Sequence, residues 1–438
     1  MKVVGIIISF FVFLKHFFCL MFFPKRTIDK IQYKKLRNVI RYAWDNVPAY
    51  RKLWESNNFK PEMFNCIADI NKIPIINKDF VRNNYEAMIS VTYQKDRLTL
   101  VTTGGTTGMP MRFYIDLYKA RAKEMAYKAV QFYRYWNILL FIDRVVVLKG
   151  RRLPEELLQK NIFWENIPYD NGIYLSSFHI CEDNYLLYLN QLRKFKPKYI
   201  KAYPSSIVAF CLLMKRHSDY GIPGLKGIIC SSENISEWHR QVVNETLGVK
   251  IFSYYGHSEK AVSAYENSHG LMEFQPLYSF VEFYDVPSNY NSNVNSLAKV
   301  IVTSFDNTYF PFIRYDTDDY IEPAVSNNVG GKFASKILGR EQEFVIAHNG
   351  DRQIFTCQDE AIWGIEGIVN YQYIQNYKGK LDLNLQVDDS FDRQSSIPVI
   401  QSRLNDIFVN IEVTIRLVNQ IDKTKAGKSR YFISNISK

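Results

Sequence analysis

The segment VTTGGTTGMP at positions 101–110 has the residue types best suited to holding a charged ligand. It contains four threonines and three glycines. Glycine lets a backbone turn sharply and approach a ligand closely, while threonine hydroxyls and free backbone N–H groups donate hydrogen bonds to phosphate oxygens. The composition therefore predicts a loop that holds a polyphosphate.

Two familiar phosphate loops do not fit this segment. A P-loop needs Gly-Lys five residues after its first glycine, and Met109-Pro110 stands there instead. The tripeptide Gly427-Lys428-Ser429 lacks the upstream glycine, because Asp422 occupies that position. A dinucleotide fingerprint should open a helix, whereas the MRFYID that follows the loop alternates as a strand does. Neither a P-loop nor a dinucleotide-binding unit is therefore expected.

Strands and helices alternate on both sides of the loop. The patterns predict two helices within 27–57, a loop and an N-capped helix in IPIINKDFVRN (73–83), a strand at 98–103, a helix at 118–135 and a buried strand in RVVVLKG (144–150). KYIKAYPSSIVAFCLLMKRH and LKGIICSSE continue the alternation. This order predicts an α/β fold layered around a largely buried sheet.

The length of 438 residues exceeds one compact core and predicts at least two domains. The apolar runs loosen between Gly331 and Gly339, where we expect a hinge. The expected organisation is an apolar segment at 1–26, a large domain at 27–338 and a small α+β domain at 339–438.

The net charge of +11 favours anionic partners, namely nucleotides, coenzyme A, acidic sugars or an anionic membrane face, although a solvated basic surface explains it equally well. No nucleic-acid-binding motif is visible, so no nucleic-acid partner is expected. The six cysteines are scattered without C-x-x-C spacing, which favours reduced thiols in a cytoplasmic protein over a disulfide framework.

Residues 3–23 are almost entirely apolar and are followed by Pro24-Lys25-Arg26. Their summed insertion free energy outweighs the cost of the central Lys15, so association with a membrane is physically allowed. The basic residues that follow would keep the body of the protein at the cytoplasmic face. The alternative is a translation start at Met21, which would remove the segment.

Five motifs in order resemble the adenylate-forming superfamily, specifically its phenylacetate–CoA ligase and CapK-type capsular polysaccharide branch. They are TTGGTTGMP, AYPSSIVAF with SSENISEWHRQ, YYGHSEK, PFIRYDTDDY and DKTKAGKSR, and they span nearly everything after the apolar segment. The resemblance implies a large multilayered amino-terminal domain and a small mobile carboxyl-terminal domain. It implies an ATP-dependent ligase that makes acyl-AMP and pyrophosphate from a carboxylic acid, then transfers the acyl group to CoA, an amine or a sugar hydroxyl.

The resemblance also implies roles for individual residues. The residues of the phosphate loop would be Thr103, Gly104, Gly105, Thr106, Thr107 and Gly108. Ser232 and Glu233 would line the nucleotide and acyl pocket, unless they only cap a helix. Tyr255 and Gly256 would border the adenine, and Ser258 would reach the α-phosphate.

Charged side chains complete the implied site. Glu259 would hold Mg²⁺, which binds one or two carboxylates together with phosphate oxygens. His257 would contact the acyl carboxylate or simply pack. The family has a ribose-binding aspartate after a glycine, but here Asp318 replaces the glycine, which leaves open whether Asp318 or Asp319 binds the ribose. Arg340 would contact ribose or phosphate.

Lys428 would be the catalytic lysine on the mobile domain, because negative charge that builds up at the α-phosphorus must be neutralised. Some relatives carry a Cys/His zinc cluster after the glutamate motif, but AVSAYENSHGLMEF (261–274) has one histidine and no cysteine, so no zinc is expected. Two alternatives remain: an aryl-acetate–CoA ligase of aromatic catabolism, and a non-catalytic scaffold that keeps the fold. The sequence does not identify the acid or the oligomeric state.

Overall fold

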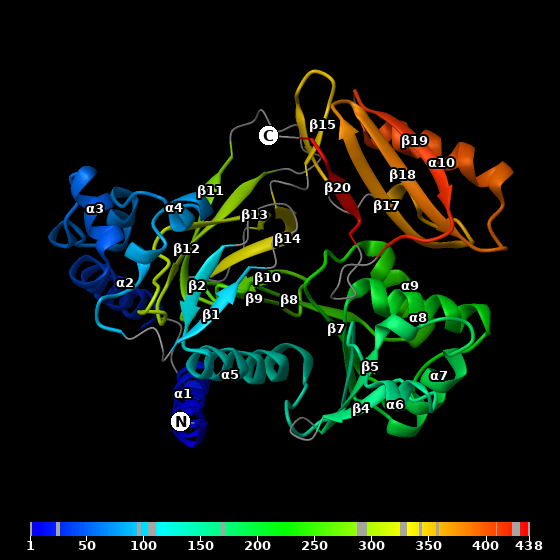
Figure 1. Cartoon of the computed structure of the whole chain (residues 1–438), viewed down its shortest axis with the longest axis horizontal. Coiled ribbons are helices and arrows are strands. Elements are labelled where there is room, and N and C mark those ends of the chain that lie inside the picture. Colours follow the sequence, from blue (N-terminus) through cyan, green and yellow to red (C-terminus); the bar gives the residue numbers. More distant parts are fainter. Residues whose placement is uncertain are drawn as a thin grey trace. The chain divides into compact units, whose positions relative to one another are not determined.

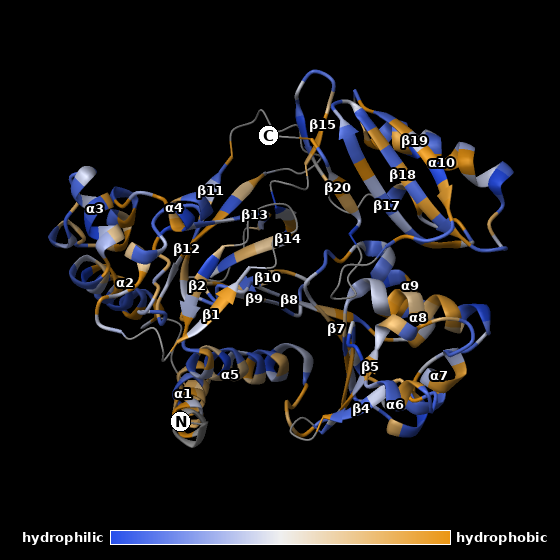
Figure 2. Ribbon diagram, in the orientation of Figure 1, coloured by the Kyte–Doolittle hydropathy of each residue, from blue (hydrophilic) through white to orange (hydrophobic). Residues whose placement is uncertain are grey.

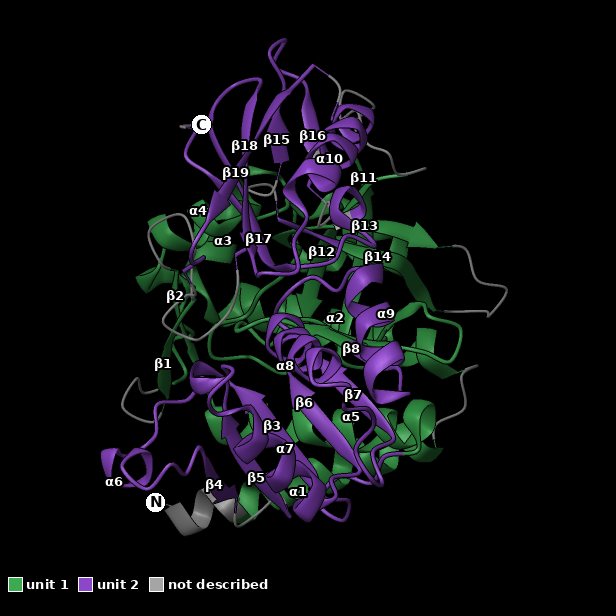
Figure 3. Cartoon of the chain, turned by 90° about the vertical axis from the view of Figure 1, so that its right-hand side faces the viewer, with its two compact units in different colours: residues 1–137, 254–286, 296–337 green, residues 138–253, 287–295, 338–438 purple. Residues whose placement is uncertain are grey.

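The computed structural model describes residues 2–22, 27–93, 98–103, 111–167, 171–286, 296–324, 331–340, 344–355, 359–408, 410–422 and 430–436. The chain divides into two compact units, coloured separately in Figure 3. Unit 1 comprises 1–137, 254–286 and 296–337, and unit 2 comprises 138–253, 287–295 and 338–438. Both combine helices with sheets (Figure 1), which confirms the predicted α/β class.

Unit 1 surrounds a mainly antiparallel sheet. Its helices are α1 (Lys2–Phe22), α2 (Ile28–Asn46), α3 (Pro48–Ser56), α4 (Lys78–Asn83) and α5 (Leu117–Trp136). Its strands are β1 (Thr99–Thr102), β2 (Arg112–Ile115), β9 (Ser263–Glu266), β10 (Met272–Phe274), β11 (Ser279–Asp285), β12 (Ala298–Ser304), β13 (Tyr315–Ala324) and most of β14 (Lys332–Arg340). The sheet order is β11-β12-β13-β14-β10-β9, while β1 and β2 pair separately as a hairpin.

Local sequence explains the helices of unit 1. In α2, the apolar residues Leu36, Val39, Ile40 and Ala43 recur at helical spacing and are buried. The side chain of Asn77 caps α4 by accepting a hydrogen bond from the Phe80 N–H at 2.9 Å. The predicted helices at 27–57, 73–83 and 118–135 are therefore confirmed as α2, α3, α4 and α5.

Unit 2 contains a parallel sheet covered by helices. Its elements up to residue 253 are β3 (Val145–Lys149), α6 (Glu155–Leu158), β4 (Trp164–Ile167), β5 (Gly172–Ser176), α7 (Tyr185–Phe195), β6 (Tyr199–Ala202), α8 (Pro204–Arg216), β7 (Gly227–Cys230), α9 (Glu237–Leu247) and the start of β8 (Ile251–Gly256). Strands β8, β7, β6, β3 and β5 are parallel, and β4 is antiparallel to β5. The four valine and leucine residues of β3 are all buried, as predicted for an interior strand.

The carboxyl-terminal part of unit 2 has its own sheet and core. Its elements are β15 (Phe344–Ile346), β16 (Arg352–Ile354), β17 (Ile368–Tyr377), β18 (Lys380–Val387), α10 (Arg393–Ile407), β19 (Glu412–Val418) and β20 (Phe432–Ser434). The sheet order is β19-β18-β17-β20, and Ile400 and Leu404 of α10 belong to its buried core. The predicted boundary at 338–339 falls inside β14, a nine-residue strand, and stays a prediction.

The apolar amino-terminal segment is helix α1, which lies alongside α5. The Ser9 hydroxyl donates a hydrogen bond to the Tyr118 carbonyl, and the Arg134 guanidinium donates one to the Leu20 carbonyl at 3.0 Å. Within the described residues, no helix combines the length and apolar content needed to cross a membrane.

Candidate active site

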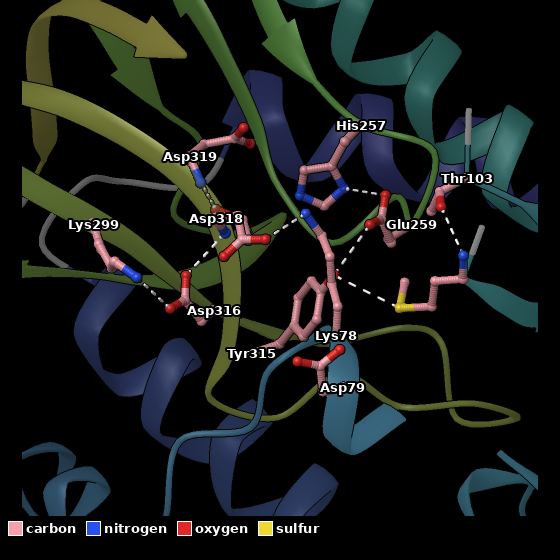
Figure 4. A network of polar contacts seen from close by, with 12 residues as sticks. Lys78, Asp79, Thr103, His257, Glu259, Lys299, Tyr315, Asp316, Asp318 and Asp319 are labelled. Carbon is pink, nitrogen blue, oxygen red and sulfur yellow. Dashed lines mark hydrogen bonds and ion pairs between the residues drawn. The ribbon is translucent and has the colours of Figure 1, made fainter. Parts of the chain in front are cut away.

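Strand β13 and the turn after β8 bring the candidate polar residues of unit 1 together (Figure 4). After β8, the Lys260 N–H donates a hydrogen bond to the His257 carbonyl at 3.1 Å, which closes a tight turn around Ser258 and Glu259. The Glu259 side chain is buried, and its Oε2 lies 3.1 Å from Nδ1 of His257. The turn thus presents a carboxylate and an imidazole side by side.

Tyr315, the first residue of β13, links Glu259 to the base of the phosphate loop. Its hydroxyl donates a hydrogen bond to Oε1 of Glu259 at 3.2 Å and lies 3.8 Å from Sδ of Met111. Burial raises the pKa of Tyr315 far above its ordinary value, and the nearby Glu259 carboxylate raises this pKa further. The phenol therefore stays protonated and acts as a hydrogen-bond donor to Glu259.

Thr103 and Met111 pair at the base of the predicted phosphate loop. The Thr103 N–H donates to the Met111 carbonyl at 2.9 Å, and the Met111 N–H donates to Oγ1 of Thr103 at 3.0 Å. The loop between them carries Gly104, Gly105, Thr106, Thr107 and Gly108, which lie outside the described residues. The base of the loop and Glu259 are thus joined through a single tyrosine.

A bulge in β13 positions the two candidate ribose-binding aspartates. The pairing of β12 with β13 shifts register between Lys299 and Ile301, which leaves residues 317–319 out of the regular ladder. Asp318 has a φ of 65°, the left-handed region that suits the glycine found there in the family pattern. Its N–H donates to Oδ1 of Asp316 at 2.9 Å, and this local turn lets an aspartate adopt the conformation.

The two aspartates have different partners. Oδ2 of Asp318 lies 2.8 Å from Nζ of Lys78, which reaches it from the first turn of α4. Oδ2 of Asp319 accepts a short hydrogen bond from the Tyr255 hydroxyl, and the Asp319 side chain is buried. Figure 4 shows Lys78 extending past the Tyr315 ring towards Asp318. Asp318 is thus neutralised by a lysine, while Asp319 lies beside the residue expected to border the adenine.

Lys78 and Tyr315 were not identified as site residues from the sequence. Lys78 follows a helix cap in an ordinary polar stretch, and 240 positions separate it from Asp318. Tyr315 only marked the start of the motif that contains Asp318 and Asp319, and 56 positions separate it from Glu259. Their roles depend on pairs that tertiary folding creates, which a single sequence does not reveal.

Three other predicted residues lie in unit 2. Glu233 accepts hydrogen bonds from the N–H and the hydroxyl of Ser205, at 3.0 and 3.1 Å, and so caps the start of α8. Ser232 follows β7 with a φ of 74°, and Arg340 ends β14. The contact between Glu233 and Ser205 is with the helix before Glu233 in the chain, and the predicted role of Glu233 in the nucleotide and acyl pocket stays a prediction. Lys428 lies outside the described residues.

The described side chains fit a magnesium site that depends on substrate oxygens. No cluster of three or more His, Cys, Asp or Glu side chains that could hold a metal occurs in the described part of the chain. Glu259 offers a buried carboxylate, whose Oε1 accepts a hydrogen bond from Tyr315 and whose Oε2 lies 3.1 Å from Nδ1 of His257. One such carboxylate suits Mg²⁺ when phosphate oxygens supply the other ligands.

Known proteins are similar to this chain in sequence and in fold. The family model described as CapK C-terminal domain matches residues 348–435. The chain is 24% identical to "Protein CapK" of Staphylococcus aureus over 93% of this chain and 89% of that protein. It is 20% identical to "Phenylacetate-coenzyme A ligase" of Thermus thermophilus over 93% of this chain and 96% of that protein.

Solved structures match the fold over the same extent. A 2-hydroxyisobutyryl-CoA ligase crystallised with 2-HIB-AMP in the postadenylation state has a TM-score of 0.72 and 18% identity, over 93% of this chain and 89% of that one. At this identity the likeness establishes the fold. A GH3.15 acyl acid amido synthetase has a TM-score of 0.56 and 13% identity, over 90% and 86% of the two chains.

Proposed function

Because the chain belongs to the adenylate-forming superfamily, in its CapK and phenylacetate–CoA ligase branch, we propose that it activates a carboxylic acid as acyl-AMP and transfers the acyl group to coenzyme A. The family makes the protein an AMP-binding ligase. The observation that supports the reaction best is the Thr103–Met111–Tyr315–Glu259 chain of contacts, since it places a buried carboxylate beside the base of the phosphate loop.

The adenylation step needs cations where negative charge accumulates. A carboxylate oxygen attacks the α-phosphorus of ATP, and pyrophosphate leaves as the new P–O bond forms. Glu259 would hold Mg²⁺, which would neutralise phosphate charge when bound. We assign Thr103, Thr106, Thr107 and the glycines of the loop to the phosphates, and Lys428 to the charge that develops at the α-phosphorus.

For the ribose we choose Asp319 over Asp318. Asp319 lies beside Tyr255, while the Lys78 pair already engages the Asp318 carboxylate. A carboxylate matches two vicinal hydroxyls because it offers two acceptor oxygens. Lys78 would then keep Asp318 from adding unpaired negative charge next to the nucleotide.

His257 is our candidate for the acyl group. Its side chain is 7% exposed, and among the described residues its Nε2 has no hydrogen-bond partner. A buried nitrogen without a partner is costly, so a substrate carboxylate that accepts its hydrogen bond would stabilise it. The remaining predicted contacts, from Gly256, Ser258, Ser232, Glu233 and Arg340, stay proposals.

We place the activity in the cytoplasm and in the assembly of a surface polysaccharide, as the CapK-type resemblance implies. Phenylacetate activation for aromatic catabolism is the alternative supported by the phenylacetate ligases among the relatives. The alternative acceptor is a sugar hydroxyl in place of CoA.

Pyrophosphate release by the full chain tests the proposal. The protein would be supplied with ATP, Mg²⁺ and a panel of acids that includes phenylacetate and short hydroxy acids, with and without CoA, and products would be identified by mass spectrometry. An acid-dependent release of pyrophosphate and an acyl-CoA product support the ligase. Release without a thioester, but with an acylated sugar, moves the acceptor to a hydroxyl. Calorimetry that finds no binding of ATP with Mg²⁺ would leave the scaffold alternative.

A further inference from the structure

Helix α1 leaves one large apolar face exposed. The exposed large side chains are Ile7, Ile8, Phe10, Phe11, Phe18, Met21 and Phe22. Ile7, Phe11, Phe18 and Phe22 follow one another at spacings of four, seven and four, which places them on one side of a helix. Phe11 is 65% exposed and Phe22 73% exposed, so this side faces away from unit 1.

The opposite side of α1 packs against α5. His16 is two positions from Phe18 and therefore about 200° around the helix. It is 8% exposed and lies against the ring of Tyr127 of α5, with ring centroids 5.9 Å apart. Burial, the largest cause, lowers the pKa of His16 to about 4, which keeps the ring neutral at physiological pH. His16 thus takes a buried place on the inner side, together with the half-buried Val12, Phe13 and Leu20, while Phe11, Phe18 and Phe22 stay exposed.

The neighbouring helix α2 shows the usual arrangement. Leu36 and Ile40 are fully buried there, while Lys30, Lys34 and Arg37 are exposed. In Figure 2, α1 appears in hydrophobic colours along most of its length, whereas α2 is mainly hydrophilic. Unlike α2, α1 leaves large apolar side chains exposed along one face, which marks this face as an interaction surface.

Polar contacts along α5 set the orientation of α1. Ser9 contacts Tyr118 near the start of α5, His16 contacts Tyr127 in the middle, and Arg134 contacts Leu20 near its end. These contacts follow the same order in both helices, so α1 lies parallel to α5 along its length. A helix held in this way presents one face to its surroundings, instead of standing free to span a bilayer.

We propose that the exposed face of α1 docks onto the surface of an anionic lipid bilayer, with the helix lying in the plane of the membrane. Such helices insert large apolar and aromatic side chains at the boundary between headgroups and acyl chains. Lys15 is exposed on the same side, four positions after Phe11, and its long side chain reaches back to the headgroups. The basic face of α2 and the net charge of +11 match anionic lipid.

Vesicle flotation of the full chain tests the docking. We expect binding to vesicles of phosphatidylcholine with phosphatidylglycerol, and at least tenfold weaker binding to phosphatidylcholine alone or in 0.5 M salt, because salt screens the basic groups. The double variant Phe11→Glu/Phe18→Glu should lose at least another tenfold. The matched control Leu186→Glu/Tyr220→Glu adds the same charge at two exposed positions of unit 2 and should bind as the parent does.

Three results would overturn the proposal. If the Phe11→Glu/Phe18→Glu variant still bound vesicles as the parent does, the exposed face of α1 would not be the membrane contact. Retention in cell membranes after carbonate extraction would indicate a spanning helix, since an interfacial one is released. The parent could instead self-associate without vesicles and fail to bind them. If the double variant abolished this self-association, the face would be an interface between copies of the chain. Thermal unfolding checks that the variants fold, and vesicle binding needs no turnover, so failure here leaves the ligase proposal intact.

Discussion

Tyr315→Phe removes one hydroxyl from the centre of the candidate site while preserving the ring. The ring is fully buried and packs against Phe312, with centroids 4.8 Å apart, so phenylalanine fills the same space. The change removes the hydrogen bond at 3.2 Å that orients the Glu259 carboxylate. The substitution therefore tests the link between the phosphate loop and the metal-binding carboxylate without opening a cavity.

The expected size follows from the charge on the acceptor. A hydrogen bond to a charged group contributes about 1.5–3 kcal/mol, and a buried acceptor left without its donor costs a similar amount. If most of this free energy is expressed in the transition state of adenylation, kcat falls on the order of ten- to a hundredfold. The unfolding free energy should also fall by about 1–3 kcal/mol, because Glu259 stays buried without its donor.

Three measurements separate this role from a structural one. Pyrophosphate release gives kcat and KM for ATP, a Mg²⁺ titration gives the concentration for half-maximal rate, and urea unfolding gives stability. We expect a lower kcat and a higher Mg²⁺ requirement, and the double variant Tyr315→Phe/Glu259→Gln should be no slower than Glu259→Gln alone. A stability loss with unchanged kcat and Mg²⁺ requirement would refute the reasoning, as would additive effects in the double variant.

The other predictions concern two lysines of the candidate site and one buried histidine. Lys78→Met should raise KM for ATP about tenfold, because it leaves the Asp318 carboxylate unpaired beside the nucleotide. Adding Asp318→Gly should restore the parent KM, and the control Lys72→Met, which removes a surface ion pair with Asp69, should leave KM unchanged. A parent-like KM in Lys78→Met would contradict the proposed role of Lys78. Lys428→Ala should lower pyrophosphate release at least a hundredfold with an unchanged unfolding temperature, and an unchanged rate would remove Lys428 from the site. Burial lowers the pKa of His239 to about 3 against about 6.5 when unfolded, so between these values the unfolded chain binds more protons and stability falls as pH falls. Urea unfolding should show a loss of about 3 kcal/mol from this group between pH 6.5 and 4; His239→Gln should flatten the profile, and an equal slope in both proteins would contradict the cause.

The sequence predicted elements well where a single face decides the structure. The spacing of Leu36, Val39, Ile40 and Ala43 identified α2, and the continuous apolar run of β3 identified an interior parallel strand. Both patterns depend only on which side chains leave water, and that information is local. The apolar composition of α1 also indicated a membrane, but the direction of its faces depends on contacts with α5, which are not local.

The sequence motifs named candidate site residues, but they did not reveal the partners of those residues elsewhere in the chain. Resemblance to the family motifs pointed to Thr103, Glu259 and one of Asp318 and Asp319. The structure links Thr103 to Glu259 through Met111 and Tyr315, and it pairs Asp319 with Tyr255. The motif left the choice between the two aspartates open, because the contacts that distinguish them, Lys78 with Asp318 and Tyr255 with Asp319, form only in the folded chain. A pair formed across hundreds of residues leaves no trace in a single sequence.

The backbone hydrogen bonds between Ile76 and the start of β13 have a consequence for synthesis on the ribosome. The Ile76 N–H donates to the Arg314 carbonyl at 3.0 Å, the Asp316 N–H donates to the Ile76 carbonyl at 2.8 Å, and the Tyr50 hydroxyl donates to the Pro311 carbonyl at 2.9 Å. Helices α2 to α4 therefore emerge on the order of 10–50 s before the strand that completes their core is translated. During that interval the nascent chain exposes apolar surface, so fragments that end before residue 310 should aggregate.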